Sequence, residues 1–180
     1  ASIYAFFIPF ILMALTYGLF DVYPIGKWMG TNYENIPKRK NPHDGAVLVL
    51  DLNGQYVYYF EALRDALWGK GSIFYNWSRN LSGEFMGIIG YYLASPFTLI
   101  VMLLPRTMLL ESLLLMQLCK LGSVGVTFSY YLQHSKKMKP MNSLIFSTAF
   151  ALCAYAVIQL MDPMWLDALI YLPLICVGVN

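Results

Sequence analysis

The chain has 180 residues, of which 58% are hydrophobic and 12% are charged, and its net charge is +2. Soluble domains average about 25% charged residues, so this composition indicates an integral membrane protein whose expected partner is the lipid bilayer. So small a net charge gives no support for a nucleic-acid partner. The three cysteines all lie in apolar runs, which indicates packing residues and argues against disulfides or a cysteine metal site.

The first apolar stretch, residues 2–20, predicts a membrane-spanning helix, since it is longer than the apolar core of a signal peptide. Residues 21–51 are polar and rich in proline and glycine, which is typical of a solvent-exposed loop. In residues 55–68 apolar side chains recur at helical spacing, with charged side chains opposite them. This pattern predicts an amphipathic helix that lies along the membrane surface.

Residues 84–105 allow two topologies. If they cross the bilayer, the lysine cluster at residues 136–139 falls on the same side as the large first loop, against the positive-inside tendency. Pro96 biases Ser95 away from helical geometry. We therefore expect a surface helix plus a re-entrant piece broken at Ser95-Pro96, which makes the lysine cluster cytoplasmic.

The predicted fold class is an all-α, polytopic membrane protein with a large external first loop that carries surface helices. The chain is expected to be the N-terminal part of one transmembrane domain in a longer protein. The predicted order is a first span at 2–20, an external loop at 21–106, a second span at 107–133, a third at 142–161 and a truncated fourth at 164–180.

Asp51 is the main candidate for chemistry. It begins the sequence Asp51-Leu-Asn-Gly-Gln55-Tyr56, and an acidic residue with amide and aromatic neighbours at a membrane surface suits reactions of lipid-linked substrates. Gln55 lies one helical turn away and could orient either a sugar hydroxyl or the carboxylate. The alternative is that Asp51 or Asn53 only caps the following helix.

Aromatic and basic residues around Asp51 also have two interpretations. The aromatic residues would stack on a sugar ring or a prenyl chain, or would serve as interfacial anchors, the commoner role; they are Tyr56, Tyr59, Trp68, Tyr75 and Trp77. Arg79 would bind a carrier phosphate or pair with Glu84. For Arg64 a surface salt bridge with Glu61 or Asp65 is favoured. The expected substrate-binding residues are Gln55, Tyr56 and Arg79.

Lys120 lies near the middle of the second predicted span, where an unpaired charge is costly, so it should face the protein interior. Glu111 is out of phase with it on a helix and is a poor partner. Lys120 would therefore have a functional or lipid-phosphate role, or form a salt bridge with a span outside the given sequence. His43 and His134 have no neighbours at ligand spacing, which makes a zinc site improbable. Whether Asp51 holds a divalent cation is left open.

The order of short motifs is similar to the GT-C class of membrane glycosyltransferases, and more closely resembles the YfhO family of bacterial membrane proteins. The resemblance covers roughly Val47 to Leu132 and rests on three segments: Leu50-Asp-Leu-Asn-Gly-Gln-Tyr56 with Phe60-Glu-Ala-Leu-Arg64, Phe74-Tyr-Asn-Trp-Ser-Arg-Asn-Leu-Ser-Gly83, and Tyr91-Tyr-Leu-Ala-Ser-Pro-Phe97. The segment Gly26–Gly45 is longer and more charged than the equivalent loop in such relatives.

The resemblance implies a multi-pass enzyme of the bacterial plasma membrane. Such an enzyme moves a sugar from a polyprenyl-phosphate carrier to an acceptor such as lipoteichoic acid on the outer face, and Asp51 would act as catalytic base or metal ligand. Lys120 suggests an alternative, a transporter or flippase for a lipid-linked or polar solute. A non-catalytic membrane scaffold is the third hypothesis.

Overall fold

The computed structural model describes residues 2–25, 47–77 and 83–179. Within these residues the chain is mostly helical, with one antiparallel pair of short strands, β1 (Tyr75–Asn76) and β2 (Gly83–Glu84), so the predicted all-α class is confirmed. The α-helices are α1 (Ser2–Leu19), α3 (Val57–Leu67), α4 (Met86–Ile88), α5 (Thr98–Leu103), α6 (Leu109–His134), α7 (Pro140–Ala151), α8 (Ala154–Ile158) and α9 (Pro163–Val179). The π-helical turns η2 (Leu52–Tyr56) and η3 (Ile89–Leu93) and the 3-10 turn η4 (Arg106–Met108) complete the order.

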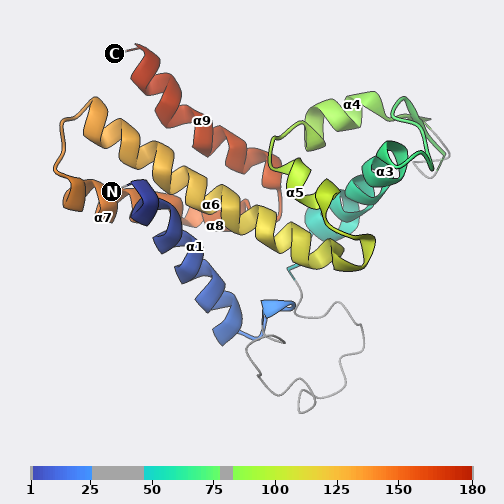
Figure 1. Cartoon of the computed structure of the whole chain (residues 1–180), viewed down its shortest axis with the longest axis horizontal. Coiled ribbons are helices and arrows are strands. Elements are labelled where there is room, and N and C mark those ends of the chain that lie inside the picture. Colours follow the sequence, from blue (N-terminus) through green and yellow to red (C-terminus); the bar gives the residue numbers. More distant parts are fainter. Residues whose placement is uncertain (1, 26–46, 78–82, 180) are drawn as a thin grey trace.

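Helix α6 runs through the centre of the molecule, and α1, α7 and α9 pack along it (Figure 1). With η4 it forms Arg106–His134, the one helix in the described part of the chain that is long and apolar enough to cross a membrane. This helix matches the second predicted span. The apolar helices Ile3–Leu19 and Pro163–Val179 match the first and fourth but are shorter, so a multi-pass topology stays a prediction.

Two glycines let α1 approach α6 closely. A Cβ atom on Gly125 would lie 2.2 Å from the backbone oxygen of Ala5, and one on Gly122 would lie 2.8 Å from the ring of Phe6. Small residues at such positions are typical of helix pairs in membranes, where close backbone approach supplies the packing energy. The close crossing of α1 and α6 therefore requires residues without a side chain at positions 122 and 125.

We expect Gly125→Ala to destabilise the protein by about 2 kcal/mol, the usual size of an overpacking effect. The added methyl group meets backbone, which cannot rotate away as a side chain can. Thermal unfolding in a fixed detergent measures the change. Gly178→Ala is the matched control, since a Cβ atom at Gly178 has nothing within 4 Å. Equal unfolding temperatures for the two variants would contradict this account of the α1–α6 contact.

Residues 48–77 and 83–104 fold into a separate layer at the N-terminal end of α6, which we call the lobe (Figure 1). Its core joins residues from η2, α3, η3 and α5 to the first two turns of α6. The buried members are Leu48, Leu52, Tyr56, Phe60, Leu63, Phe85, Ile88, Leu93, Val101, Met102, Leu109, Leu113 and Met116. Because this core is continuous with α6, the lobe is fixed to the helix bundle.

The lysine turn lies at the opposite end of α6 from the lobe. Helices α6 and α7 form a hairpin through Ser135–Lys139, and Pro140 occupies the first turn of α7, where proline is tolerated. Ser129 and Ser143 hydrogen bond across this hairpin at 2.9 Å. The lobe and the lysine turn thus lie at opposite ends of α6, and their placement on different sides of a membrane stays a prediction.

The expected break at Ser95-Pro96 is present. Helical structure ends at Leu93, and α5 begins only at Thr98. Ser95 donates its backbone N–H to the Leu93 carbonyl at 2.8 Å, and the Thr98 hydroxyl donates to the same carbonyl at 2.7 Å. The Leu93 carbonyl, at the end of the helical structure, is thus satisfied by a backbone donor and a side-chain donor.

Residues 142–161, predicted as one span, do not form one continuous helix. Helix α7 ends at Ala151, and the short α8 starts at Ala154 after an extended Cys153. After α8, α6 satisfies the carbonyls of the turn that leads into α9: the Gln117 amide donates to Leu160 at 2.7 Å and the Lys120 ammonium to Pro163 at 2.8 Å. These side chains make the non-helical backbone tolerable inside an apolar bundle.

Candidate functional site

Asp51 lies where the chain enters the lobe. Leu50, just before it, has φ of 46°, a left-handed conformation that costs a β-carbon-bearing residue about 1 kcal/mol or more. This turn starts η2 and leaves the Asp51 side chain exposed. The carboxylate makes no capping hydrogen bond at the start of η2 but accepts one from the Gln55 amide at 3.4 Å. The structure therefore brings Asp51 and Gln55 together, and Asp51 does not act as a helix cap.

A second carboxylate, Asp162, lies near Asp51. It belongs to the turn between α8 and α9, more than a hundred residues along the chain. Burial raises the pKa of the Asp162 carboxyl, and the negative charge of Asp51 raises it further. The nearby Tyr56 hydroxyl lowers the pKa of Asp162, although it makes no hydrogen bond of standard geometry. Sequence reasoning missed Asp162 because nothing in its own neighbourhood relates it to Asp51.

Tyr56 forms the buried floor of this region. It is 0% exposed, and its ring packs edge-on against Tyr92 of η3, with the ring centres 5.3 Å apart. Burial raises the pKa of the Tyr56 hydroxyl, with further contributions from Asp162, Tyr92 and Asp51. Tyr56 therefore holds η2 against η3 and does not line the open cavity beside them. Arg79, the fourth predicted site residue, lies outside the described residues, as does Gly26–Gly45.

A cavity of about 840 Å³ opens on the lobe beside Gln55. Its wall combines aromatic, amide and charged side chains from η2, α3 and β1, which is the mixture that small polar ligands require. The lining residues are Gly54, Gln55, Tyr58, Tyr59, Glu61, Ala62, Asp65, Lys70, Gly71, Ser72, Tyr75, Asn76, Trp77, Phe85, Ile88 and Arg106. Of the aromatic candidates, Tyr59, Tyr75 and Trp77 line this cavity, whereas Tyr56 and Trp68 do not.

The expected pairing of Arg64 with Glu61 or Asp65 is wrong. Arg64 is buried, and its guanidinium donates to the backbone oxygens of Val101 and Leu104. These carbonyls end α5, where the chain becomes extended and they lose their helical donors. Arg106 takes the acidic partners instead, at 3.5 Å from Glu61 and 4.0 Å from Asp65.

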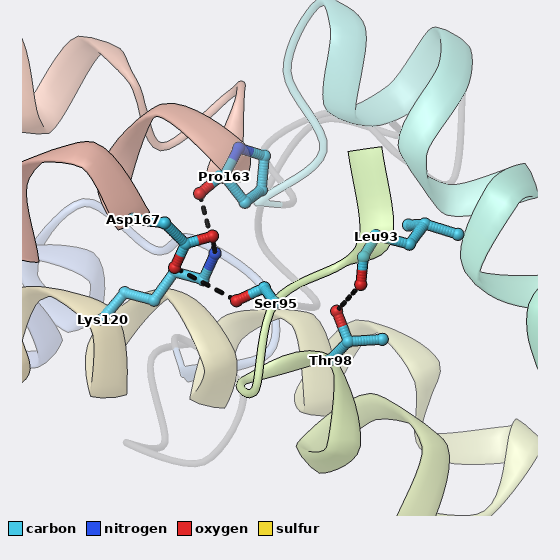
Figure 2. Close-up of polar contacts among 6 residues, drawn as sticks. All are labelled: Leu93, Ser95, Thr98, Lys120, Pro163 and Asp167. Atoms are coloured by element: carbon cyan, nitrogen blue, oxygen red, sulfur yellow. Dashed lines mark hydrogen bonds and ion pairs between the residues drawn. The ribbon is translucent and has the colours of Figure 1, made fainter. Parts of the chain in front are cut away.

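Lys120 and Asp167 form a buried ion pair between α6 and α9 (Figure 2). The ammonium lies 2.8 Å from the carboxylate, and Lys120 is 1% exposed. The other oxygen of Asp167 accepts a hydrogen bond of 3.1 Å from the Ser95 hydroxyl. The expectation that Lys120 faces the protein interior is confirmed, and it forms a salt bridge, although the partner lies on α9 of this sequence and not on a span outside it. The network also ties the helix break of the lobe to the bundle.

Among the described residues, no group of three histidine, cysteine, aspartate or glutamate side chains is arranged to hold a metal ion. The site there consists of Asp51 and Gln55, the neighbouring Asp162, and the cavity that Gln55 lines. Whether a divalent cation takes part stays an open expectation.

Comparison with known proteins gives one match. Residues 38–180 match the family model described as "Bacterial membrane protein YfhO". No curated protein and no solved structure matches the chain. The match covers the lobe, α6 and all the helices that follow it, and so includes every residue of the site.

Proposed function

Because the chain belongs to the YfhO family of bacterial membrane proteins, we propose that it is part of a membrane glycosyltransferase. The enzyme would move a sugar from a polyprenyl-phosphate carrier to an acceptor of the cell envelope such as lipoteichoic acid. The lobe would lie on the outer face of the plasma membrane, the lysine turn in the cytoplasm, and α1, α7–α8 and α9 would cross the bilayer beside α6.

The observation that carries the proposal is the position of Asp51. Its carboxylate is exposed, is held by Gln55 and is not used as a helix cap. Gln55 in turn lines a cavity rich in aromatic and amide side chains, at one end of a helix long enough to span a membrane. A carboxylate so placed can remove a proton from a hydroxyl group that is bound in the cavity.

In the proposed reaction, Asp51 accepts the proton of an acceptor hydroxyl while that oxygen bonds to the anomeric carbon of the donor sugar. The bond from the anomeric carbon to the carrier phosphate breaks, and the phosphate leaves with the electron pair. Arg79 is proposed to bind that phosphate, since guanidinium groups present paired donors to phosphate oxygens. Tyr56 is proposed to act by holding η2 and Gln55 in position.

The transporter hypothesis rests on a lysine buried in the middle of a predicted span, and the structure supplies that lysine with partners inside the helix bundle. An unpaired lysine inside a membrane helix would mark a pathway for a charged solute. Lys120 instead pairs with Asp167 and donates to the Pro163 carbonyl, and these contacts join α6 to α9 (Figure 2).

The test is sugar transfer in vesicles that contain the natural full-length protein and a polyprenyl-phosphate hexose labelled in the sugar. We expect the label to appear in added lipoteichoic acid, and vesicles without the protein serve as the control. Movement of the labelled carrier across the bilayer without any transfer would favour a flippase. If neither sugar transfer nor carrier movement occurs with any envelope acceptor, only the scaffold hypothesis remains.

A further inference from the structure

The cavity on the lobe has a composition that selects its ligand. We propose that it binds the uncharged pyranose ring of a hexose, stacked against Tyr75 and Trp77, beside the Asp51–Gln55 pair. This inference rests on the proposed glycosyl transfer and adds the subsite that holds one of the two sugars. The sequence allows five aromatic residues to stack on a sugar or a prenyl chain or to anchor the chain at the interface, and the structure places Tyr75 and Trp77 together on the wall of this cavity.

The aromatic wall is the first argument. The rings of Tyr75 and Trp77 pack edge-to-face with centres 5.0 Å apart, and Trp77 is nonetheless 80% exposed. Tyr58 on α3 is also exposed and lines the same cavity. A pyranose ring presents C–H groups on its faces and hydroxyls at its edge, so it covers an aromatic face while keeping its hydroxyls available for hydrogen bonds.

The charge of the cavity is the second argument. Its described lining contains two acidic residues, Glu61 and Asp65, and two basic residues, Lys70 and Arg106, so these formal charges cancel. Arg106 is moreover paired with both acids. A phosphate or diphosphate site needs surplus positive charge or several converging donors. The cavity therefore suits a neutral sugar ring better than the phosphate of a carrier.

Connection to the proposed base is the third argument. Gln55 lines the cavity, and its amide donates to the Asp51 carboxylate at 3.4 Å. The amide of Gln55 has both donor and acceptor groups that suit sugar hydroxyls. The volume of about 840 Å³ is in the range of small-molecule sites and leaves room for a hexose with part of its aglycone.

The experiment measures binding of methyl glycosides to the full-length protein in nanodiscs, because many common detergents carry sugar headgroups. Methyl glucopyranoside, methyl galactopyranoside and methyl N-acetylglucosaminide are the probes, and glucose 1-phosphate is the charged comparison. We expect at least one methyl glycoside to bind, and Trp77→Ala to weaken it about tenfold, the effect of one lost stacking contact.

Trp68→Ala is the matched control. Trp68 is also an exposed tryptophan of the lobe, at 70%, but it does not line the cavity. We expect this variant to bind like the natural protein. Equal losses in both variants, or binding of none of the methyl glycosides, would overturn the proposal. Glucose 1-phosphate binding more tightly than every methyl glycoside would overturn the assignment to a neutral ring.

A transfer assay then identifies which sugar occupies the subsite. In Trp77→Ala, a raised KM for the polyprenyl-phosphate hexose assigns the subsite to the donor, and a raised KM for lipoteichoic acid assigns it to the acceptor. An unchanged KM for both substrates contradicts the proposal. Glycoside binding does not depend on turnover, so failure of the subsite and failure of the proposed transferase function give different results.

Discussion

Asp51→Asn is expected to lower the rate of sugar transfer by about 100- to 10,000-fold, the range of a general base. An amide has nearly the shape of the carboxylate but cannot accept the proton of the acceptor hydroxyl. Since the Asp51 side chain is exposed and accepts a hydrogen bond from the neighbouring Gln55, the substitution should leave folding and membrane insertion intact. Transfer of labelled sugar in vesicles and the amount of inserted protein are the two measurements.

Glu111→Gln serves as the control for Asp51→Asn. It also replaces a carboxylate with an amide, but on α6, where the side chain accepts a hydrogen bond of 3.3 Å from the Tyr23 hydroxyl, and an amide oxygen can still accept it. We expect normal transfer from this variant. Full activity in Asp51→Asn would show that Asp51 is not the base and would direct attention to Asp162.

Asp167→Asn is expected to destabilise the protein by about 3–5 kcal/mol, the usual cost of removing one partner from a buried ion pair. The Lys120 ammonium would stay buried between α6 and α9 with its charge uncompensated. The Ser95 hydroxyl would also lose its carboxylate acceptor. Thermal unfolding of the purified protein in one detergent gives the size of the effect.

Asp65→Asn is the matched control for this prediction. It makes the same chemical change in an ion pair with Arg106 that is 4.0 Å long and partly exposed, where pairs contribute about 0–1 kcal/mol. The double variant Lys120→Met with Asp167→Leu should recover most of the lost stability, since both charges are then absent. A single variant as stable as the control would mean that the pair contributes nothing to the packing of α6 and α9.

The elements that the sequence predicts well are those with a local cause. The long apolar run gives α6, the spacing of apolar residues gives α3, and Pro96 gives the break before α5. The break between α7 and α8 has no comparable signal. No proline or glycine lies at Leu152 and Cys153, where α7 ends and the chain becomes extended.

The side-chain partners that the sequence does not predict are residues that lie far apart in the chain. Lys120 finds its partner 47 residues later, and Arg64 finds the end of α5 about 40 residues later. No pattern within one helix identifies such partners, so a charged neighbour in the sequence was favoured for Arg64. The same holds for Asp162: the packing of α9, and not the sequence around Asp162, brings this carboxylate near Asp51.

The link from Ser95 through Asp167 to Lys120 affects the distance from the bilayer at which the proposed reaction would occur. The Ser95 hydroxyl joins the lobe to the buried Lys120–Asp167 pair of the bundle, so tilting or lifting the lobe would break the hydrogen bond from Ser95 to Asp167. This contact favours a constant position of the lobe relative to the helix bundle. If the proposed function holds, Asp51 would stay at one height above the lipid, where a carrier anchored in the same bilayer would present its head group, and the acceptor polymer would have to reach down to it.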